Sequence, residues 1–548
     1  MIEEVRGALG RARVFARALV KTGMAFAVSP RALPVIARQR LRRESSLATA
    51  VRLHATSRPE REALVGEKRR LTWAELDQRI EVFVRGLYHH YGLRRGDPVL
   101  LVMRNCTELL EAQIAVPRIG ASAVPVSWRS TTEELEYLIE HSGARAVIVE
   151  SAIAGAVLSI RERLDTVPRN CFIGVGERRD GLFPYERVIE GSAAAAPESA
   201  NLGAVVIYTS GTTGRPKGAV RRFPRETQDA VLRFLVETPI CEDDRHLAVC
   251  PMYHSTAFGF IGFTMAVGGT VVVTSAFDAE DFLRIVERER ITSTAVVPTM
   301  LYRILDLPDE VLTRYDTTSL RAVFCGGAPL SGAIARRFME RFGHVLYNFY
   351  GATETGINTL ATPEELLMSP GTIGHAVGGN ELLLVDDEGR PVSPGQTGEL
   401  YVKNAMLVAG YHQDDAATRA SMRDGYFSVG DLAHRDGEGL FHLDGRKRDM
   451  IISGGVNVYP REVEETLCRH PGVAEAAVVG VDDDEWGERV RAFVRIEKGQ
   501  SLDAEDVMVF ARLHLAGPKA PRDVIFLDEL PKNPTGKVLK RELRTYRD

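Results

Sequence analysis

The chain has 548 residues, 45% hydrophobic and 26% charged, a composition typical of a folded globular protein. Its formal net charge of −5 argues against a general nucleic-acid-binding protein, which would need a basic face. The six cysteines form no CxxC pair, so the sequence predicts neither a zinc site nor a disulfide framework and favours a reducing cytoplasm.

Residues 1–45 form a basic N-terminal extension. Within residues 1–43, arginine and lysine greatly outnumber the two acidic residues, Glu3 and Glu4, and apolar residues recur at helical spacing from Val5 to Leu19. This pattern predicts an amphipathic helix. Two interpretations stay open: the helix packs on the main body, or residues 1–43 bind peripherally to an anionic membrane surface, which would be the inner membrane face.

Residues 255–277 contain no charged side chain and exceed the length of about 20 residues that spans a bilayer. However, the segment holds several glycines, and Gly268 and Gly269 lead into a β-branched run. The pattern therefore favours a buried helix, a turn and a buried strand over a transmembrane helix.

From residue 46 to residue 447, short apolar runs alternate with amphipathic helical stretches, for example at residues 270–273, 279–290 and 293–297. This alternation predicts an α/β fold with largely parallel sheets. The charged stretch at residues 444–449 is typical of an exposed domain boundary. It separates residues 46–447 from a smaller domain, residues 448–548, with strands and helices of its own.

A run of small and hydroxylated residues, YTSGTTGRPKG, follows a predicted strand at residues 208–218. Its glycines allow a tight turn that presents backbone N–H groups to an anion, and Lys217 adds a positive charge. The motif predicts a phosphate-binding loop. It is not of the Walker type, because Lys217 lies between Pro216 and Gly218.

Together with four later motifs, this loop resembles the adenylate-forming superfamily, which includes acyl-CoA synthetases. The later motifs, in chain order, are YGATET at 350–355, YFSVGD at 426–431, DGRKRD with SGGVNVYP at 444–460, and PKNPTGK at 531–537. The resemblance covers nearly the whole chain from residue 46. It implies a large N-terminal adenylation domain with parallel-rich sheets and a small β-barrel-like part, followed by a small, mobile α+β C-terminal domain.

The resemblance also implies roles for individual residues. Lys537, Thr353 and Glu354 would be catalytic, and Glu354 would also bind Mg²⁺ because a carboxylate is a hard oxygen ligand. The expected ATP- and AMP-binding residues are Thr209, Ser210, Gly211, Thr212, Thr213, Gly214, Lys217, Gly326, Gly327, Ala328, Tyr350, Gly351, Asp431 and Arg446. Asp431 would accept hydrogen bonds from the ribose hydroxyls.

The acid substrate is less well determined. Peptide-synthetase adenylation domains hold the substrate amino group with an aspartate where this chain has Gly259, so a simple carboxylic acid is favoured over an amino acid. The expected pocket residues are His254, Phe258, Gly259, Thr299 and Gly356. We expect a medium- or long-chain fatty acid, with an aromatic or steroidal acid as the alternative.

Coenzyme A is the expected acyl acceptor, and a carrier protein is the alternative. With ATP and Mg²⁺, the first step would form acyl-AMP while Lys537 points inward. The small domain would then rotate near Arg448, where relatives usually carry an acidic residue or lysine, and bring Gly454 and Gly455 to the thiol path. The sequence leaves the oligomeric state open, with a homodimer as one expectation.

Overall fold

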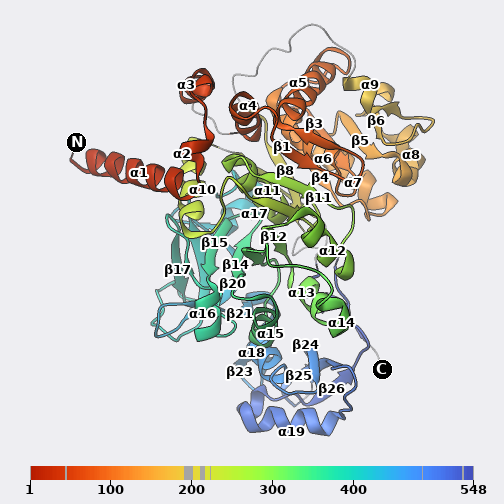
Figure 1. Ribbon diagram of the computed structural model, residues 1–548. Coiled ribbons are helices and arrows are strands. Elements are labelled where there is room, and N and C mark those ends of the chain that lie inside the picture. The colour runs from red at the N-terminus through yellow and green to blue at the C-terminus, as the bar shows by residue number, and fades with distance from the viewer. Residues whose placement is uncertain are drawn as a thin grey trace.

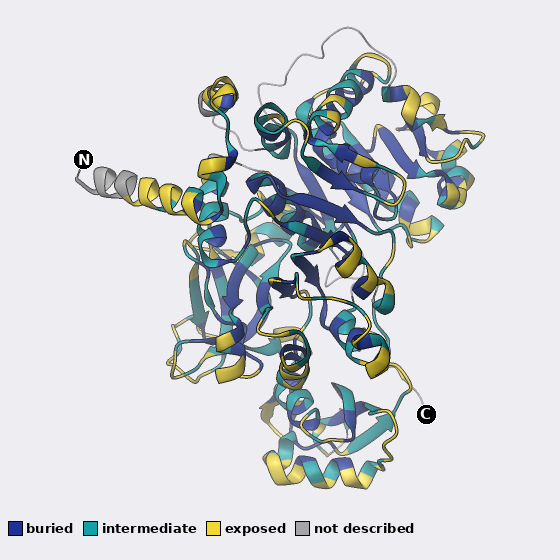
Figure 2. Ribbon diagram, in the orientation of Figure 1, coloured by how far each residue is buried: buried dark blue, intermediate teal, exposed yellow. Residues whose placement is uncertain are grey.

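The computed structural model describes residues 2–42, 46–189, 202–209, 216–222, 224–483, 485–533 and 536–546. A large body contains three β-sheets, and a smaller part with its own sheet lies beside it at the C-terminal end (Figure 1). Strands are buried inside both parts, while the helices expose their outer faces (Figure 2). The α/β class and the division into a large N-terminal and a small C-terminal part agree with the prediction.

The first sheet of the large body has seven strands and is mostly parallel. In spatial order they are β7 (Phe183–Pro184), β6 (Phe172–Val175), β5 (Ala146–Glu150), β3 (Pro98–Val102), β4 (Ser122–Val126), β8 (Val205–Thr209) and β9 (Lys217–Arg221). The antiparallel pair of β8 and β9 closes one edge and carries the first motif in its connection.

The second sheet has nine strands, and its central strands are parallel and buried on both faces, as helix-covered sheets require. In spatial order they are β16 (His375–Ala376), β15 (Gly356–Ala361), β14 (Leu346–Ala352), β13 (Ala322–Cys325), β12 (Ser293–Val296), β10 (Arg245–Ala248), β11 (Thr270–Val273), β1 (Glu62–Val65) and β2 (Arg70–Thr72). The uncharged segment at 255–277 is helix α11 (Ser255–Val267), a turn and buried β11, as predicted.

The third sheet is antiparallel and contains β17 (Glu381–Val385), β18 (Gly398–Lys403), β19 (Met422–Arg423), β20 (Tyr426–Arg435) and β21 (Phe441–Arg446). The sheet of the C-terminal part contains β22 (Ile451–Ser453), β23 (Val456–Val458), β24 (Val473–Asp483), β25 (Gly487–Ile496) and β26 (Asp523–Phe526). Between β21 and β22 lies a short 3-10 turn, Lys447–Asp449, at the predicted domain boundary.

Helices cover these sheets and begin at recognisable caps. Thr72, Thr131 and Thr362 each cap a helix reciprocally with a glutamate three residues later. The helices of the large body are α5 (Trp73–His89), α6 (Thr107–Arg118), α7 (Thr132–Ser142), α8 (Gly155–Ile160), α9 (Tyr185–Ile189), α10 (Arg225–Glu237), α11, α12 (Ala279–Glu289), α13 (Pro298–Leu305), α14 (Asp309–Leu312), α15 (Gly332–Phe342), α16 (Pro363–Met368) and α17 (Asp415–Ser421). The C-terminal part adds α18 (Pro460–Leu467), α19 (Ala504–His514) and α20 (Lys540–Arg544).

The N-terminal extension folds as α1 (Ile2–Lys21), α2 (Met24–Ala27) and α3 (Leu33–Arg42), and α4 (Leu47–Ser57) follows it. Helix α1 packs against α10 at its C-terminal end, while its N-terminal end projects from the body (Figure 1). This packing agrees with the first of the two interpretations of the basic segment. No helix in the described part of the chain is long and apolar enough to cross a membrane.

Candidate active site

A cavity of about 1000 Å³ lies where the first and second sheets meet the third. Side chains from β8, β9, α11, the turn between β14 and β15, β20 and β21 line it. One end is polar and includes Asp431, Arg446 and Lys537, and the other is mostly apolar and extends along α11. A second cleft adjoins the polar end and separates the large body from the C-terminal part.

Asp431 lies at the centre of the polar end. Strand pairing places it opposite Arg446, whose Nε lies 3.0 Å from Asp431 Oδ1. The hydroxyl of Tyr350, on β14, donates to Asp431 Oδ2 at 2.8 Å. Each carboxylate oxygen has a further lone pair, so Asp431 can still accept hydrogen bonds from a sugar diol while both partners hold it in place.

Lys537 reaches this polar end from the C-terminal part. A tight loop presents it, because the Lys537 amide donates to Asn533 Oδ1 at 2.9 Å and Gly536 adopts a positive φ of 78°. A Cβ at Gly536 would lie 2.6 Å from Thr299 Oγ1, so only glycine permits this approach to α13. Burial lowers the pKa of Lys537 to about 8; the positive charge of Arg446 adds to the effect and Asp431 opposes it.

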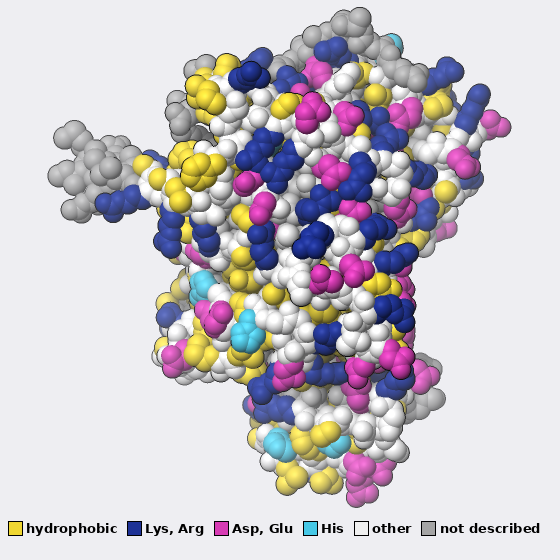
Figure 3. Space-filling view, in the orientation of Figure 1, with side chains coloured by type: hydrophobic (Ala, Val, Ile, Leu, Met, Phe, Trp, Pro, Cys, Tyr) yellow, Lys and Arg dark blue, Asp and Glu magenta, His cyan; other side chains and the backbone are white. Residues whose placement is uncertain are grey.

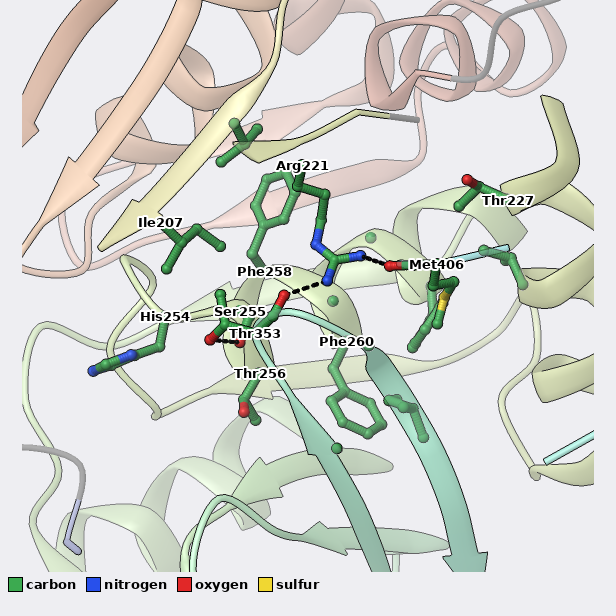
Figure 4. A pocket seen from close by; sticks show the side chains of 18 of the residues that line it. Ile207, Arg221, Thr227, His254, Ser255, Thr256, Phe258, Phe260, Thr353 and Met406 are labelled. Atoms are coloured by element: carbon green, nitrogen blue, oxygen red, sulfur yellow. Dashed lines mark hydrogen bonds between the residues drawn. The ribbon is translucent and has the colours of Figure 1, made fainter. Parts of the chain in front are cut away.

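Thr353 and Glu354 lie in the turn between β14 and β15. The hydroxyl of Tyr411 donates to Glu354 Oε1 at 3.0 Å, and Glu354 is buried at 8% exposure. Thr353 Oγ1 shares a hydrogen bond of 3.2 Å with Ser255 Oγ, at the start of α11 (Figure 4). The Thr353 hydroxyl and the Glu354 carboxylate therefore lie next to the start of α11, where the predicted acid pocket begins.

Arg221, which sequence reasoning missed, holds this turn through the backbone. Its guanidinium donates to the backbone oxygen of Thr353 and, at 2.6 Å, to that of Met406 (Figure 4). Burial lowers its pKa to about 10, with Glu354 opposing the change. The available signal was an arginine that ends the short run Gly218–Val220, since a charge that becomes buried needs a specific partner.

The structure describes only part of the first motif, residues 208–218. Thr209 ends β8, Lys217 begins β9, and both line the cavity, where Lys217 Nζ forms an ion pair of 3.0 Å with Asp414. The predicted phosphate-binding residues Ser210, Gly211, Thr212, Thr213 and Gly214 lie outside the described residues.

The glycines after β13 allow close backbone packing. A Cβ at Gly326 would lie 2.5 Å from the Phe349 ring, and Gly327 adopts a positive φ of 79°. Gly327 and Gly351 line both the cavity and the adjoining cleft, whereas Ala328 and Tyr350 line the cleft alone. Gly326 lines neither space.

The structure brings four of the five predicted acid-pocket residues, His254, Phe258, Gly259 and Gly356, to the cavity wall. Burial lowers the pKa of His254 to about 4, so its imidazole is neutral near pH 7. The fifth, Thr299, lines the adjoining cleft instead, because α13 begins at Pro298 and directs Thr299 toward Gly536. Val297 and Met300 line the cavity instead.

Arg448, Gly454 and Gly455 do not lie together in this arrangement. Arg448 is in the Lys447–Asp449 turn and lines both the cavity and the cleft. Gly454 and Gly455 form an exposed β22–β23 turn with positive φ angles of 57° and 77° and line neither space. The structure therefore has Lys537 inward and the Gly454–Gly455 turn outward.

Comparison with known proteins agrees with this geometry. The "AMP-binding enzyme" family model matches residues 51–412, and the model of the corresponding C-terminal domain matches residues 462–537. The chain belongs to the AMP-binding enzyme family. It is thus a member of the adenylate-forming superfamily, as the motifs predicted.

Individual relatives define the type of enzyme. A feruloyl-CoA synthase from Amycolatopsis sp. is 36% identical over 483 residues, covering 86% of this chain and 93% of the relative. An indoleacetate–CoA ligase from Aromatoleum aromaticum is 34% identical, covering 90% and 96%. The crystal structure of the anthranilate CoA ligase AuaEII with anthranoyl-AMP is 25% identical with a TM-score of 0.85, covering 92% and 97%. This member of the family is an AMP-forming carboxylic acid–CoA ligase that uses ATP and CoA.

Proposed function

We propose that this ligase activates a carboxylic acid whose body is apolar and carries a ring, and transfers the acyl group to coenzyme A. The relatives described above are named for feruloyl, indoleacetate and anthranilate substrates, and this replaces the fatty acid expected from sequence. The observation that carries the proposal is the apolar pocket along α11, which begins beside Thr353 and Lys537.

The pocket is suited to a planar apolar group. Phe258, Phe260 and Phe263 line it from one short stretch of α11, and a Cβ at Gly259 would meet no atom within 4 Å. Aromatic side chains stack favourably on a substrate ring. The carboxylates among the described lining residues are Glu354, Glu399 and Asp431, all at the polar end, so the apolar end provides no partner for a substrate ammonium.

The polar end fits MgATP. Glu354 and the Thr353 hydroxyl offer the hard oxygen ligands that Mg²⁺ takes, and Tyr411 holds the carboxylate in place. Bound Mg²⁺ would neutralise charge on the phosphates. Lys537 would place its ammonium beside the α-phosphate, where negative charge increases as the carboxylate attacks, and Asp431 with Arg446 would hold the ribose.

Two arrangements of the C-terminal part would complete the reaction. The inward Lys537 suits acyl-AMP formation. Rotation about the Lys447–Asp449 turn would then withdraw Lys537 and bring the Gly454–Gly455 turn to the cleft, where the CoA thiol attacks the acyl-adenylate and AMP leaves.

A screen of acids tests this function. Purified enzyme with MgATP would receive cinnamic, indolic, benzoic, steroidal and fatty acids, each with and without CoA, while AMP release and acyl-CoA mass are measured. We expect CoA-dependent turnover with a ring-bearing acid. Acyl-AMP that accumulates and stays unreactive toward CoA would instead indicate a carrier-protein acceptor, and exclusive use of straight-chain acids would contradict the proposed substrate class.

Membrane contact through residues 1–43 stays a separate prediction. Val20, Phe26 and Leu33 are exposed beside basic residues, and apolar side chains gather at the N-terminal side of the molecule (Figure 3). Basic and apolar groups together favour an anionic bilayer. Co-sedimentation with phosphatidylglycerol vesicles should therefore exceed that with phosphatidylcholine vesicles, and equal recovery from both would contradict the prediction.

A further inference from the structure

Helices α1–α3 lie outside the matched family model, which begins at residue 51, yet they are firmly attached to the large body. Ala18 and Thr22 of the first segment are fully buried, and the Glu242 amide donates to the Thr22 backbone oxygen at 2.8 Å. Gly23 turns the chain with a positive φ of 75°, and a Cβ there would lie 2.7 Å from the Glu242 side chain. The junction between α1 and α2 is therefore held by close packing against the large body.

Their inner faces line the cavity of the active site. Leu19 and Phe15 are four residues apart and share one side of α1, and Met24, Val28 and Ile36 continue the same wall. Leu19, Met24, Val28 and Ile36 are each partly buried. The end of the apolar pocket is thus built by a segment that none of the proposed catalytic roles uses.

The opposite wall is α11, whose length gives the reach of the pocket. Ser255, at the start of α11, bonds Thr353 in the polar end, while Ala266 near its end lines the same cavity. At 1.5 Å per residue, these positions are roughly 16 Å apart along the helix. Met24 packs against an apolar cluster that contains Phe234 of α10 and Phe263 and Val267 of α11, so α2 lies beside the cluster to which the far end of α11 belongs.

Two glycines keep the space between the ends open. A Cβ at Gly259 would meet nothing within 4 Å, and one at Gly262 would meet only Leu47, at 3.5 Å. The pocket therefore continues from Thr353 at the polar end, past Gly259 and Gly262, to the N-terminal helices.

We infer that α1–α3 form the distal wall of the acid pocket and select acids whose apolar body extends beyond a single aromatic ring. This inference rests on the proposed function, since it describes the far end of the same acid site. Leu19, Met24 and Ile36 are the specificity-determining positions. An acid with one ring near its carboxylate leaves them unfilled, and a longer or fused-ring acid contacts them.

The test compares phenylpropanoate with phenyloctanoate carrying its ring at the chain end. The measurement is the ratio of kcat/KM for the long acid to that for the short acid, in the CoA-dependent reaction of the full chain. Leu19→Trp should lower this ratio roughly tenfold or more, because it fills space needed by several methylenes. The matched control is Val20→Trp on the same helix, where Val20 is 68% exposed and does not line the cavity.

A second pair of variants, on α3, provides the same test if a variant of the first pair misfolds. Ile36→Trp should also lower the ratio, whereas Leu33→Trp on the same helix, where Leu33 is 62% exposed, should keep it. Equal ratios for the inward and outward variants of both pairs would overturn the distal-wall inference while leaving CoA-ligase activity on the short acid intact. Absence of acyl-CoA from both acids with the unmodified chain would instead count against the proposed substrate class.

Discussion

The two ends of the active-site cavity are built on different physical principles. At the polar end, directed bonds fix two of the predicted site residues: Asp431 is held by Tyr350 and Arg446, and Glu354 by Tyr411. At the apolar end, the shape of the pocket would determine which acid binds, because aromatic side chains line it and the space beside Gly259 is open. Changes at the first end should therefore affect chemistry with any acid, and changes at the second should affect the choice of acid.

The largest effect is expected for Lys537→Ala. Loss of the ammonium beside the α-phosphate should slow acyl-AMP formation by about 10²–10³-fold, the usual cost of losing one electrostatic stabiliser. Given pre-formed acyl-AMP and CoA, the same variant should form thioester at nearly the unmodified rate. Separate measurement of the two half-reactions checks this expectation, and equal loss in both would indicate a fixed C-terminal part or a general folding defect.

Glu354→Gln comes next. The amide keeps the size of the side chain and can accept the Tyr411 hydrogen bond, but it removes the charge that would bind Mg²⁺. Adenylation should fall by roughly 10²-fold with every accepted acid. The check is pyrophosphate release over a Mg²⁺ titration, and an unchanged Mg²⁺ dependence would exclude Glu354 from metal binding.

Sequence reasoning performed differently at the two ends for the same physical reason. Asp431, Glu354 and Lys537 stand in motifs whose residue types are set by phosphate and sugar chemistry, so they could be located without a structure. The apolar end has no such constraint, because many apolar residues fill a pocket equally well. Thr299 was therefore predicted for the acid pocket although it lines the adjoining cleft, and the contribution of Leu19 and Met24 was not foreseen.

The hydrogen bonds that hold the Thr353–Glu354 turn from distant parts of the chain could not be predicted from the sequence either. Arg221 reaches Thr353 and Met406 across more than a hundred residues of chain, and Tyr411 reaches Glu354. No local pattern connects such positions. The α/β alternation, by contrast, is a local pattern and was predicted, and helix caps such as Asp278 at α12 are local in the same way.

Gly259→Leu tests the apolar end. The side chain would enter the open space in the middle of the pocket, so kcat/KM for ring-bearing acids should fall about tenfold or more. The KM for ATP should stay nearly constant, because Gly259 lies on α11 away from Asp431 and Arg446. A parallel rise in the KM for ATP would show that the two ends are coupled and would break the distinction drawn above.

The smallest expected effect is a pH dependence that belongs to the polar end alone. Burial lowers the pKa of Lys537 to about 8, so its ammonium is present below that pH and is lost as pH rises through it. The kcat/KM for adenylation should accordingly be about half its plateau value near pH 8 and decline further above it, with the same profile for short and long acids. Lys537→Arg should move this decline out of the measured range, because a guanidinium stays protonated there. Thioester formation from pre-formed acyl-AMP should lack the decline, since Lys537 has then withdrawn; a decline shared by both half-reactions would mean that another group titrates.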